Sequence, residues 1–445
     1  MADAANDSFR YVLQNILGMV GISLYILADT FFISLSVGAD GITALNLVLP
    51  IYSLIFAIGA MIGVGAAIRF AVAKGKGEKN ADAYFSNALF FATIAGIVFL
   101  VLGIFAPEGI IRLLGGDDNI VATGAAYTRI FMLFAPCFMW NSICNAFVRN
   151  DGAPFTAMLA TLLSSLFNIV MDYVLMFPLG LGMAGAALAT AFSPVVGVGI
   201  CCAHLLSKKS SVRLRRIRPS VKKLLRSCQV GVSAFVGEIS SGVTTIAFNF
   251  IILGLAGNVG VAAYGVVANT ALVAVAMFNG VSQGSQPLVS EFYGKNDWKR
   301  VRSVLLMGVC TALVLAAGMI FVIWKWTTPI ANIFNSEGNP ELTAYAGEGL
   351  RIYFLGFLFA GINIVGTGVL SAVESARWAF AASVARGLVL ILCCAFLLSA
   401  LFGMRGVWMA FPAAEFLTMA ISFLGLCGIL KGQQETKDGG TYGSV

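Results

Sequence analysis

Long apolar runs separated by short polar stretches dominate the chain. Each run reaches the roughly 20 residues that one α-helix needs to cross the hydrocarbon core of a bilayer. The alternation of apolar and polar residues that marks a membrane β-barrel is absent, and uninterrupted apolar runs satisfy their backbone groups in lipid only as helices. The pattern predicts an all-α integral membrane protein with twelve transmembrane helices. The expected spans are Phe9–Val37, Thr43–Ala73, Tyr84–Phe105, Ile120–Val148, Phe155–Phe177, Ala184–Leu206, Leu224–Leu255, Val261–Phe292, Val301–Trp324, Leu342–Leu370, Trp378–Leu401 and Val407–Leu430.

Composition and charge support this interpretation. Of the 445 residues, 59% are hydrophobic and only 11% charged, which excludes an ordinary water-soluble globule. Lysine and arginine gather on alternate connections, so we expect these to be cytoplasmic, as are both termini, in a multi-pass protein of the inner (plasma) membrane. The net charge of +7 is therefore expected to meet anionic membrane lipids and not nucleic acid. The basic positions are Arg69, Lys74, Lys76 and Lys79, then Lys208, Lys209, Arg213, Arg215, Arg216, Arg218, Lys222, Lys223 and Arg226, then Lys295, Lys299, Arg300 and Arg302.

The chain also repeats itself. A segment that begins at Phe32 resembles one that begins at Phe250, and further matches follow in the same order. Six predicted helices separate the matched elements, so the two halves share one orientation in the membrane. We predict two pseudo-symmetric six-helix lobes, 1–206 and 227–431, with a basic cytoplasmic linker at 207–226 and a disordered tail at 432–445. The further matches are Gly75 with Gly294, Lys76 with Lys295, Pro107 with Pro329, Arg129 with Arg351 and Gly185 with Gly406.

Four polar residues inside predicted spans of the first lobe stand out as functional candidates. Asn168 and Asp172 are one helical turn apart and share a helix face, while Asp29 and Thr190 lie in two other spans. A carboxylate in the membrane interior is costly unless it is paired, hydrated or protonated. An all-oxygen cluster of these residues suits Na⁺ or a shared proton, so we predict that they form a cation-coupling site. The alternative is a buried polar network that only holds helices together.

The second lobe has fewer such residues. Glu238 and Glu415 lie within predicted spans and are candidates for contact with a substrate or a proton. An apolar pocket for small organic molecules is also expected, with Phe56, Met61, Met277 and Phe278 as candidate lining residues. Acidic residues near the span ends are expected to form interfacial salt bridges. The expected pairs are Glu374 with Arg377, Asp151 with Arg149 and Glu291 with Lys295.

These features together resemble one transporter family. The sequence Ala28-Asp29-Thr30-Phe31-Phe32-Ile33, followed by Gly38, Ala44 and Gly75-Lys76-Gly77-Glu78-Lys79-Asn80, is similar to the multidrug and toxic-compound extrusion (MATE) family. In the branch related to DNA-damage-inducible protein F, a first-helix Asp, an Asn and Asp four apart in the fifth helix and a sixth-helix Thr form a cation site. The resemblance implies that role for Asp29, Asn168, Asp172 and Thr190. It implies an antiporter that exports small organic, often cationic compounds in exchange for Na⁺ or H⁺.

Glu238 matches a seventh-helix Glu of other branches of that family, so a cation role in the second lobe is an open alternative. Two departures stand beside the resemblance. The first helix contains no proline, whereas bending at such a proline belongs to one mechanism proposed for archaeal members. The tenth helix lacks a mid-span Asp found in some relatives.

Other classes of function fit the sequence less well. Gly180–Gly185 and Gly280–Gly284 match nucleotide-binding and hydrolase motifs, but neither has the strand context that such a motif requires, so we expect no enzyme. A lipid-linked oligosaccharide flippase of the same superfamily is the main alternative, although the membrane-embedded charges here are mainly acidic. A passive channel would need a repeated ring of charged residues, and the sequence contains none. Cysteine spacing predicts neither zinc nor a disulfide framework. We expect a monomer that needs no cofactor beyond the coupling ion.

Overall fold

The structure is a computed structural model that describes residues 2–333 and 339–438. Helices make up almost all of these residues, and the described ranges contain no β-strand. The helices of the first half are α1 (Ala2–Ser36), α2 (Ala39–Gly75), α3 (Ala83–Phe105), α4 (Pro107–Leu113), α5 (Asp118–Leu133), α6 (Ala135–Asn150), α7 (Pro154–Met176) and α8 (Gly182–Leu205). The second half contains α9 (Val221–Gly294), α10 (Trp298–Lys325), α11 (Thr327–Ile333), α12 (Pro340–Tyr353), the 3₁₀ turn η1 (Phe354–Gly356), α13 (Phe357–Ala372), α14 (Ala376–Val384), the π-helical turn η2 (Ala385–Val389), α15 (Leu390–Phe402) and α16 (Met404–Asp438).

Ten of the helical segments are long and apolar enough to cross a membrane, and the bent pair α5 and α6 counts as an eleventh. The pair is bent by 48°, so the predicted span Ile120–Val148 is two helices and not one. The bend follows from Pro136, which has no backbone N–H to donate and whose ring crowds the preceding turn. The chain is therefore a multi-pass membrane protein.

The long helix α9 is broken near its middle. Gly257 adopts φ 60° and ψ −155°, which is not a helical conformation, and the backbone on either side forms two helices that meet there. This region of backbone conformation is open essentially to glycine alone. The sequence predicts two spans here, Leu224–Leu255 and Val261–Phe292, and Gly257 falls between them.

Irregular features recur at the same spacing in the two halves. The break at Phe134, between α5 and α6, has its counterpart in η1, which begins 220 positions later at Phe354. The short helix α4 starts at Pro107, and α11 starts 220 positions later at Thr327. Neither short helix is predicted from hydrophobicity, because each is too brief to show a period. The repeat seen in the sequence thus extends to local backbone structure.

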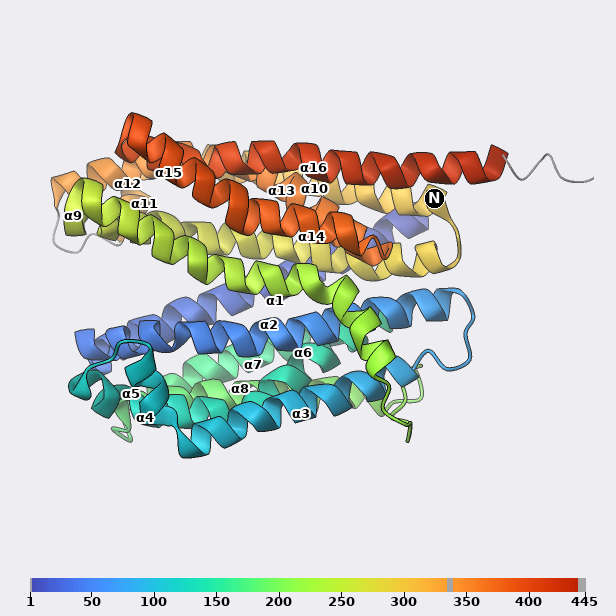
Figure 1. Cartoon of the computed structure of the whole chain (residues 1–445), viewed down its shortest axis with the longest axis horizontal. Coiled ribbons are helices and arrows are strands. Elements are labelled where there is room, and N and C mark those ends of the chain that lie inside the picture. Colours follow the sequence, from blue (N-terminus) through green and yellow to red (C-terminus); the bar gives the residue numbers. More distant parts are fainter. Residues whose placement is uncertain (1, 334–338, 439–445) are drawn as a thin grey trace, which may run out of the picture.

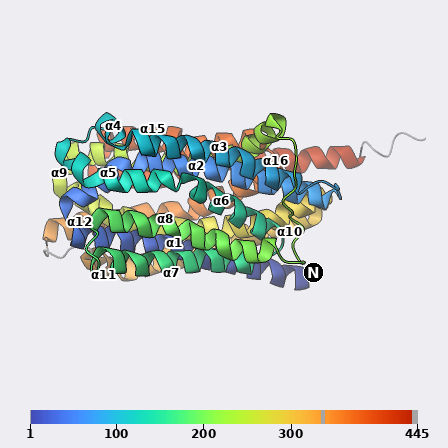
Figure 2. The ribbon, with the colours of Figure 1, turned by 90° about the horizontal axis from the view of Figure 1, so that it is seen from below.

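Buried apolar side chains form two large clusters. The first draws its fully buried members from residues 33–212, and the second from residues 248–414 together with Val12. Figure 1 shows the corresponding arrangement: α2 to α8 form the lower half, and the later part of α9 with α10 to α16 forms the upper half. The helix α1 passes between them, and the view from below in Figure 2 shows it beside α7 and α8.

The last helix extends further than the apolar pattern indicates. Disorder is expected from residue 432, yet α16 continues to Asp438, and residues 439–445 lie outside the described ranges. The added segment contains Gln, Glu and Lys, which favour helix where a preceding turn is already formed.

Candidate cation and substrate site

The four polar residues predicted for the first lobe meet in the structure. Asn168 and Asp172 on α7 are completely buried, Thr190 on α8 is 4% exposed and Asp29 on α1 is 8% exposed. The carboxyl groups of Asp29 and Asp172 lie close enough for a hydrogen bond between them. Such a bond requires a proton on one of the two groups, because an ionised carboxylate only accepts.

Asn168 joins this carboxyl pair to α8. Its Nδ2 atom lies 3.3 Å from the Thr190 hydroxyl oxygen. With the amide turned over, it donates to Asp172 Oδ2 at 3.2 Å and accepts from the Thr190 backbone N–H at 3.2 Å. The second carboxyl oxygen of Asp29 and that of Asp172, both Oδ1, are buried without a hydrogen-bond partner among the described residues. Unsatisfied acceptors in an apolar interior favour the binding of a proton or a small cation.

Three tyrosines surround the carboxyl pair, and sequence reasoning missed them. The Tyr25 hydroxyl lies 3.3 Å from that of Tyr52, and Tyr127 lies close to Thr190. Tyr25 also lies close enough to Asp29, one helical turn away on α1, to interact with its charge. That i, i+4 spacing is visible in the sequence and is the signal that could have identified Tyr25.

Glu238 lies on the first part of α9, across from α1. Its side chain is exposed, although α9 is one of the candidate membrane spans. The Glu238 carboxyl lies within electrostatic range of Tyr25 on α1. Tyr25 therefore has acidic neighbours from both halves of the chain.

Glu415 occupies a different environment. It is 2% exposed on α16 and accepts hydrogen bonds from Arg386 Nη2 at 2.8 Å and from Asn363 Nδ2 at 2.8 Å. Asn363 in turn accepts from Ser422 at 3.0 Å. Arg386, in η2, lies within the predicted span Trp378–Leu401 and is a membrane-embedded charge that the sequence analysis overlooked. Glu415 is thus a fully paired group of the second half.

The predicted pocket residues are placed unevenly. Phe56 is half-buried and its ring stacks on Tyr52 with centroids 4.5 Å apart, beside the carboxyl pair. Met61 and Met277 are also half-buried. Phe278 is completely buried and stacks on Phe357 at 5.7 Å, inside the second apolar cluster. In this conformation Phe278 occupies a core position, and no substrate reaches it.

The two halves touch at one end of the bundle. We call it the basic end, because α2 ends there at Lys74 and Gly75, α9 ends there at Gly294, and the connection 206–220 lies there. Gly75 and Gly294 are so close that a Cβ added to either would lie 3.0 Å from the Cα of the other. A Cβ on Gly65 of α2 would collide with the carbonyl of Ser227 on α9.

Polar contacts reinforce this junction. Arg69 of α2 forms an ion pair of 2.6 Å with Glu374, which follows α13. Arg149 at the end of α6 donates to Gln283 of α9 at 2.5 Å and to Asn15 of α1 at 3.3 Å. The expected pairing of Glu374 with Arg377 and of Asp151 with Arg149 is therefore wrong: in both cases the partner is distant in sequence, because helix packing and not chain proximity brings it near.

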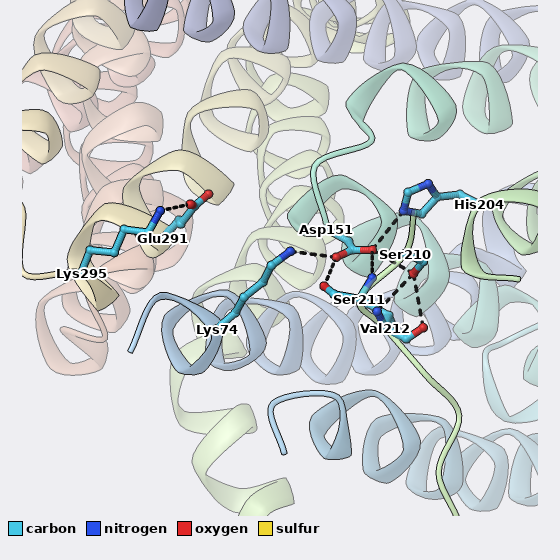
Figure 3. A network of polar contacts seen from close by, with 8 residues as sticks. All are labelled: Lys74, Asp151, His204, Ser210, Ser211, Val212, Glu291 and Lys295. Atoms are coloured by element: carbon cyan, nitrogen blue, oxygen red, sulfur yellow. Dashed lines mark hydrogen bonds and ion pairs between the residues drawn. The ribbon is translucent and has the colours of Figure 1, made fainter. Parts of the chain in front are cut away.

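Asp151, just after α6, is the centre of a separate network at the basic end (Figure 3). It accepts hydrogen bonds from Lys74 at 2.9 Å, His204 at 3.0 Å and Ser210 at 2.8 Å, and also from Ser211. Burial alone would raise the pKa of the Asp151 carboxyl, but the hydrogen bonds from Ser211, Lys74 and His204 outweigh it and hold that pKa below its usual range. The network ties the connection 206–220 to the first half. Figure 3 also shows Glu291 paired with Lys295, as predicted.

Comparison with known proteins gives consistent matches. The MatE family model matches residues 15–174 and 234–397. Multidrug export protein MepA of Staphylococcus saprophyticus is 27% identical over 395 residues, which cover 88% of this chain and 86% of that protein. MepA of Staphylococcus aureus is 25% identical over 423 residues, 93% of this chain and 92% of that protein. A multidrug resistance MATE family transporter in an outward-facing conformation has the same fold, with a TM-score of 0.91 over 97% of each chain at 22% identity.

Proposed function

Because this chain belongs to the MatE family, we propose that it is a multidrug efflux transporter that exports small organic molecules in exchange for a cation. The function of its relatives, multidrug export, supports the first part of the proposal. The carboxyl pair Asp29 and Asp172 carries the second part, because two carboxyl groups with unsatisfied oxygens are buried in a membrane-spanning bundle.

We infer twelve spans in two lobes of six. The count follows if the bent pair α5 and α6 is one span and α9 is two spans that meet at Gly257. Three further observations support two lobes: the two apolar clusters, the recurring irregularities 220 positions apart, and the two matches of the family model, which begin 219 positions apart at residues 15 and 234. By the positive-inside rule, the basic end faces the cytoplasm.

The contacts between the lobes suggest which side is closed. Close glycine approaches between the lobes, such as Gly65 to Ser227 and Gly75 to Gly294, and the ion pair Arg69 to Glu374 lie toward the basic end. Tight backbone contact on this side is what a closed cytoplasmic side requires, which supports an outward-facing state. The likeness to a transporter in that state agrees with this inference. Export then requires these contacts to separate so that substrate can enter from the cytoplasm.

Coupling follows from the state of the carboxyl pair. A proton or Na⁺ that binds at Asp29 and Asp172 removes the repulsion and the desolvation cost of the two ionised groups. If the bound ion stabilises one lobe arrangement and substrate stabilises the other, each ligand displaces the state that the other prefers. Glu238 and the tyrosines beside the pair would then place a cationic substrate close to the ion site.

The alternative of a lipid-linked oligosaccharide flippase finds less support. Recognition of a pyrophosphate would need cationic side chains that are free to bind it. The buried Arg149 and the half-buried Arg386 are already engaged, Arg386 by Glu415 and Arg149 by Gln283 and Asn15.

The proposal is tested with the purified chain in proteoliposomes loaded with a fluorescent organic cation. A Na⁺ gradient and a pH gradient are imposed separately, and substrate movement against its own gradient is recorded. Transport driven by one of the gradients supports the antiporter and identifies its ion. Movement that neither gradient accelerates contradicts it.

A further inference from the structure

The segment that connects the two lobes, residues 206–220, is fixed to the first lobe along its length. Beyond the bonds of Ser210 and Ser211 to Asp151, the Arg215 backbone N–H donates to Ser86 at 2.9 Å. Ser220 exchanges two hydrogen bonds with Asn87, at 2.8 and 3.2 Å. These partners lie near the start of α3. A connection of this length does not need to contact either lobe. Because it is attached to α3, it forms a defined surface together with that helix.

A pocket of about 360 Å³ lies between this segment and α3. That volume is enough for part of a small amphiphilic molecule. Its walls combine apolar side chains with guanidinium groups. The lining residues are Ser86, Phe90, Leu214, Arg215, Arg216, Ile217 and Pro219.

The arginines of the segment are not equivalent. Arg215 is already engaged, because its Nε donates to Asp82 at 2.5 Å and its Nη1 to Asn80 at 3.3 Å. Arg216 and Arg218 are exposed and form no hydrogen bond or ion pair with the described part of the chain. Their donors are free to bind an anion, and the planar guanidinium matches the geometry of a phosphate.

The pocket opens onto an apolar stripe along α3. Phe90, which lines the pocket, is 45% exposed, and exposed apolar residues continue from it at the spacing of one helix face. The distance along the helix from Phe90 to Val101 is about 16 Å at 1.5 Å per residue, close to half of the roughly 30 Å hydrocarbon core. The members of the stripe are Phe90, Ile94, Ile97, Val98, Val101, Leu102 and Phe105.

We propose that this pocket is a binding site for an anionic phospholipid of the cytoplasmic leaflet. Arg216, which lines the pocket, binds the phosphate group, and Arg218, two positions along the same segment, adds a second positive charge beside it. Leu214 and Phe90 contact the glycerol region, and an acyl chain lies along the stripe of α3. The stripe favours a lipid over a soluble phosphate or an acidic peptide, because neither of those would cover an apolar surface that descends into the membrane. The site rests on the orientation inferred above, with the basic end in the cytoplasm.

The consequence is a lipid held against the connection between the lobes. Since residues 206–220 are the direct covalent link from the first lobe to α9, the bound lipid would hold the start of that link at the membrane surface while the lobes move.

Binding is measured by native mass spectrometry of the full chain in detergent, titrated with phosphatidylglycerol and with phosphatidylcholine of the same acyl chains. The test variant is Arg216→Gln with Arg218→Gln. The matched control is Lys76→Gln with Lys79→Gln, which removes two exposed charges at the same end of the bundle but outside the pocket. A basic residue near an anionic surface contributes a factor of about five, so the arginine variant should weaken phosphatidylglycerol binding by about tenfold or more and the control by less than about threefold.

A variant with Arg216→Lys and Arg218→Lys keeps the charges and should retain most of the binding, which separates loss of recognition from loss of folding. Equal losses of phosphatidylglycerol binding in the Arg216→Gln, Arg218→Gln variant and in the Lys76→Gln, Lys79→Gln control would overturn the proposal. Equal affinity for phosphatidylglycerol and phosphatidylcholine would overturn it as well. If soluble glycerol phosphate competes as well as phosphatidylglycerol, the site binds a free phosphate and the lipid proposal is overturned. None of these readouts depends on transport, so failure of the antiporter proposal would be seen separately.

Discussion

Arg69 Nη1 and Glu374 Oε1 lie 2.6 Å apart, although 305 positions separate the two residues in the chain. The pair joins α2 of the first half to the turn between α13 and α14 of the second. In an alternating-access cycle it must form when the cytoplasmic side closes and break when that side opens.

Reversal of one charge in this pair should open the cytoplasmic side. Arg69→Glu alone places two carboxylates together and should shift the equilibrium toward the inward-facing state by about 1 to 2 kcal/mol, and Glu374→Arg should act in the same way. The double variant restores an ion pair and should recover the original balance. Distances between spin labels at Lys79 and Lys299, in a cysteine-free background, report the change. Failure of the double variant to recover the distance would mean that the pair does not couple the lobes.

Gly65→Ala should act on the same junction through sterics. The added Cβ would collide with the Ser227 carbonyl, so the two helices must separate at this point. The matched control is Gly242→Ala, because no heavy atom lies within 4 Å of a Cβ at that position. Alanine itself favours helix by about 1 kcal/mol over glycine. The first variant should therefore lose most transport and show longer label distances, while the second keeps both. Equal transport and equal label distances in the Gly65→Ala and Gly242→Ala variants would contradict the close contact between Gly65 and Ser227.

The Arg386 to Glu415 pair should contribute to stability. Glu415→Gln leaves the guanidinium without its counter-charge in a membrane-spanning helix, at a cost of roughly 3 kcal/mol. The double variant Glu415→Gln with Arg386→Gln removes both charges and should recover most of the thermal midpoint Tm in detergent. A single variant as stable as the original chain would show that the pair is not held together as described. Recovery of Tm without transport would assign the pair a part in export as well.

The Asp151 network predicts a pH dependence of stability. Its folded pKa lies below the unfolded value, so the network contributes its full stability above the unfolded pKa of about 4 and loses that contribution as pH falls through the folded pKa. Asp151→Asn should lower Tm at neutral pH, by the equivalent of about 1 to 3 kcal/mol. The difference in Tm between the two proteins should stay constant from pH 8 to about pH 5 and narrow below about pH 4. A difference that grows at acidic pH would contradict the network.

The sequence predicted the class of fold and four polar residues that the structure brings together, for a clear physical reason. Membrane-spanning helices are recognised in a sequence by their length and apolarity. A carboxylate such as Asp172 inside one is therefore easy to identify. Local backbone irregularities were not predictable in the same way. The π-helical turn at Ala385–Val389 alters the helix without a change in apolar character. The break at Phe134 did have a signal in Pro136, inside the predicted span Ile120–Val148, and that signal was not used.

Ion-pair partners on different helices were also not predicted from the sequence. Arg386 was overlooked although it lies in a predicted span, and the partners of Glu374 and Asp151 were sought nearby in the chain. Ion pairs between spans depend on which helix faces meet, and the order of residues in one chain does not specify this. Tyr25 could have been predicted from the sequence, because its spacing from Asp29 is that of one helical turn.

The central claim is that the carboxyl pair couples ion movement to export. The most direct measurement is transport of a fluorescent organic cation by Asp172→Asn in proteoliposomes, with and without the driving gradient. Gradient-driven accumulation should fall by at least about tenfold, because the ion no longer favours one lobe arrangement over the other, while downhill exchange of the cation persists. Full gradient-driven transport by Asp172→Asn, with an unchanged dependence on the ion, would contradict the account.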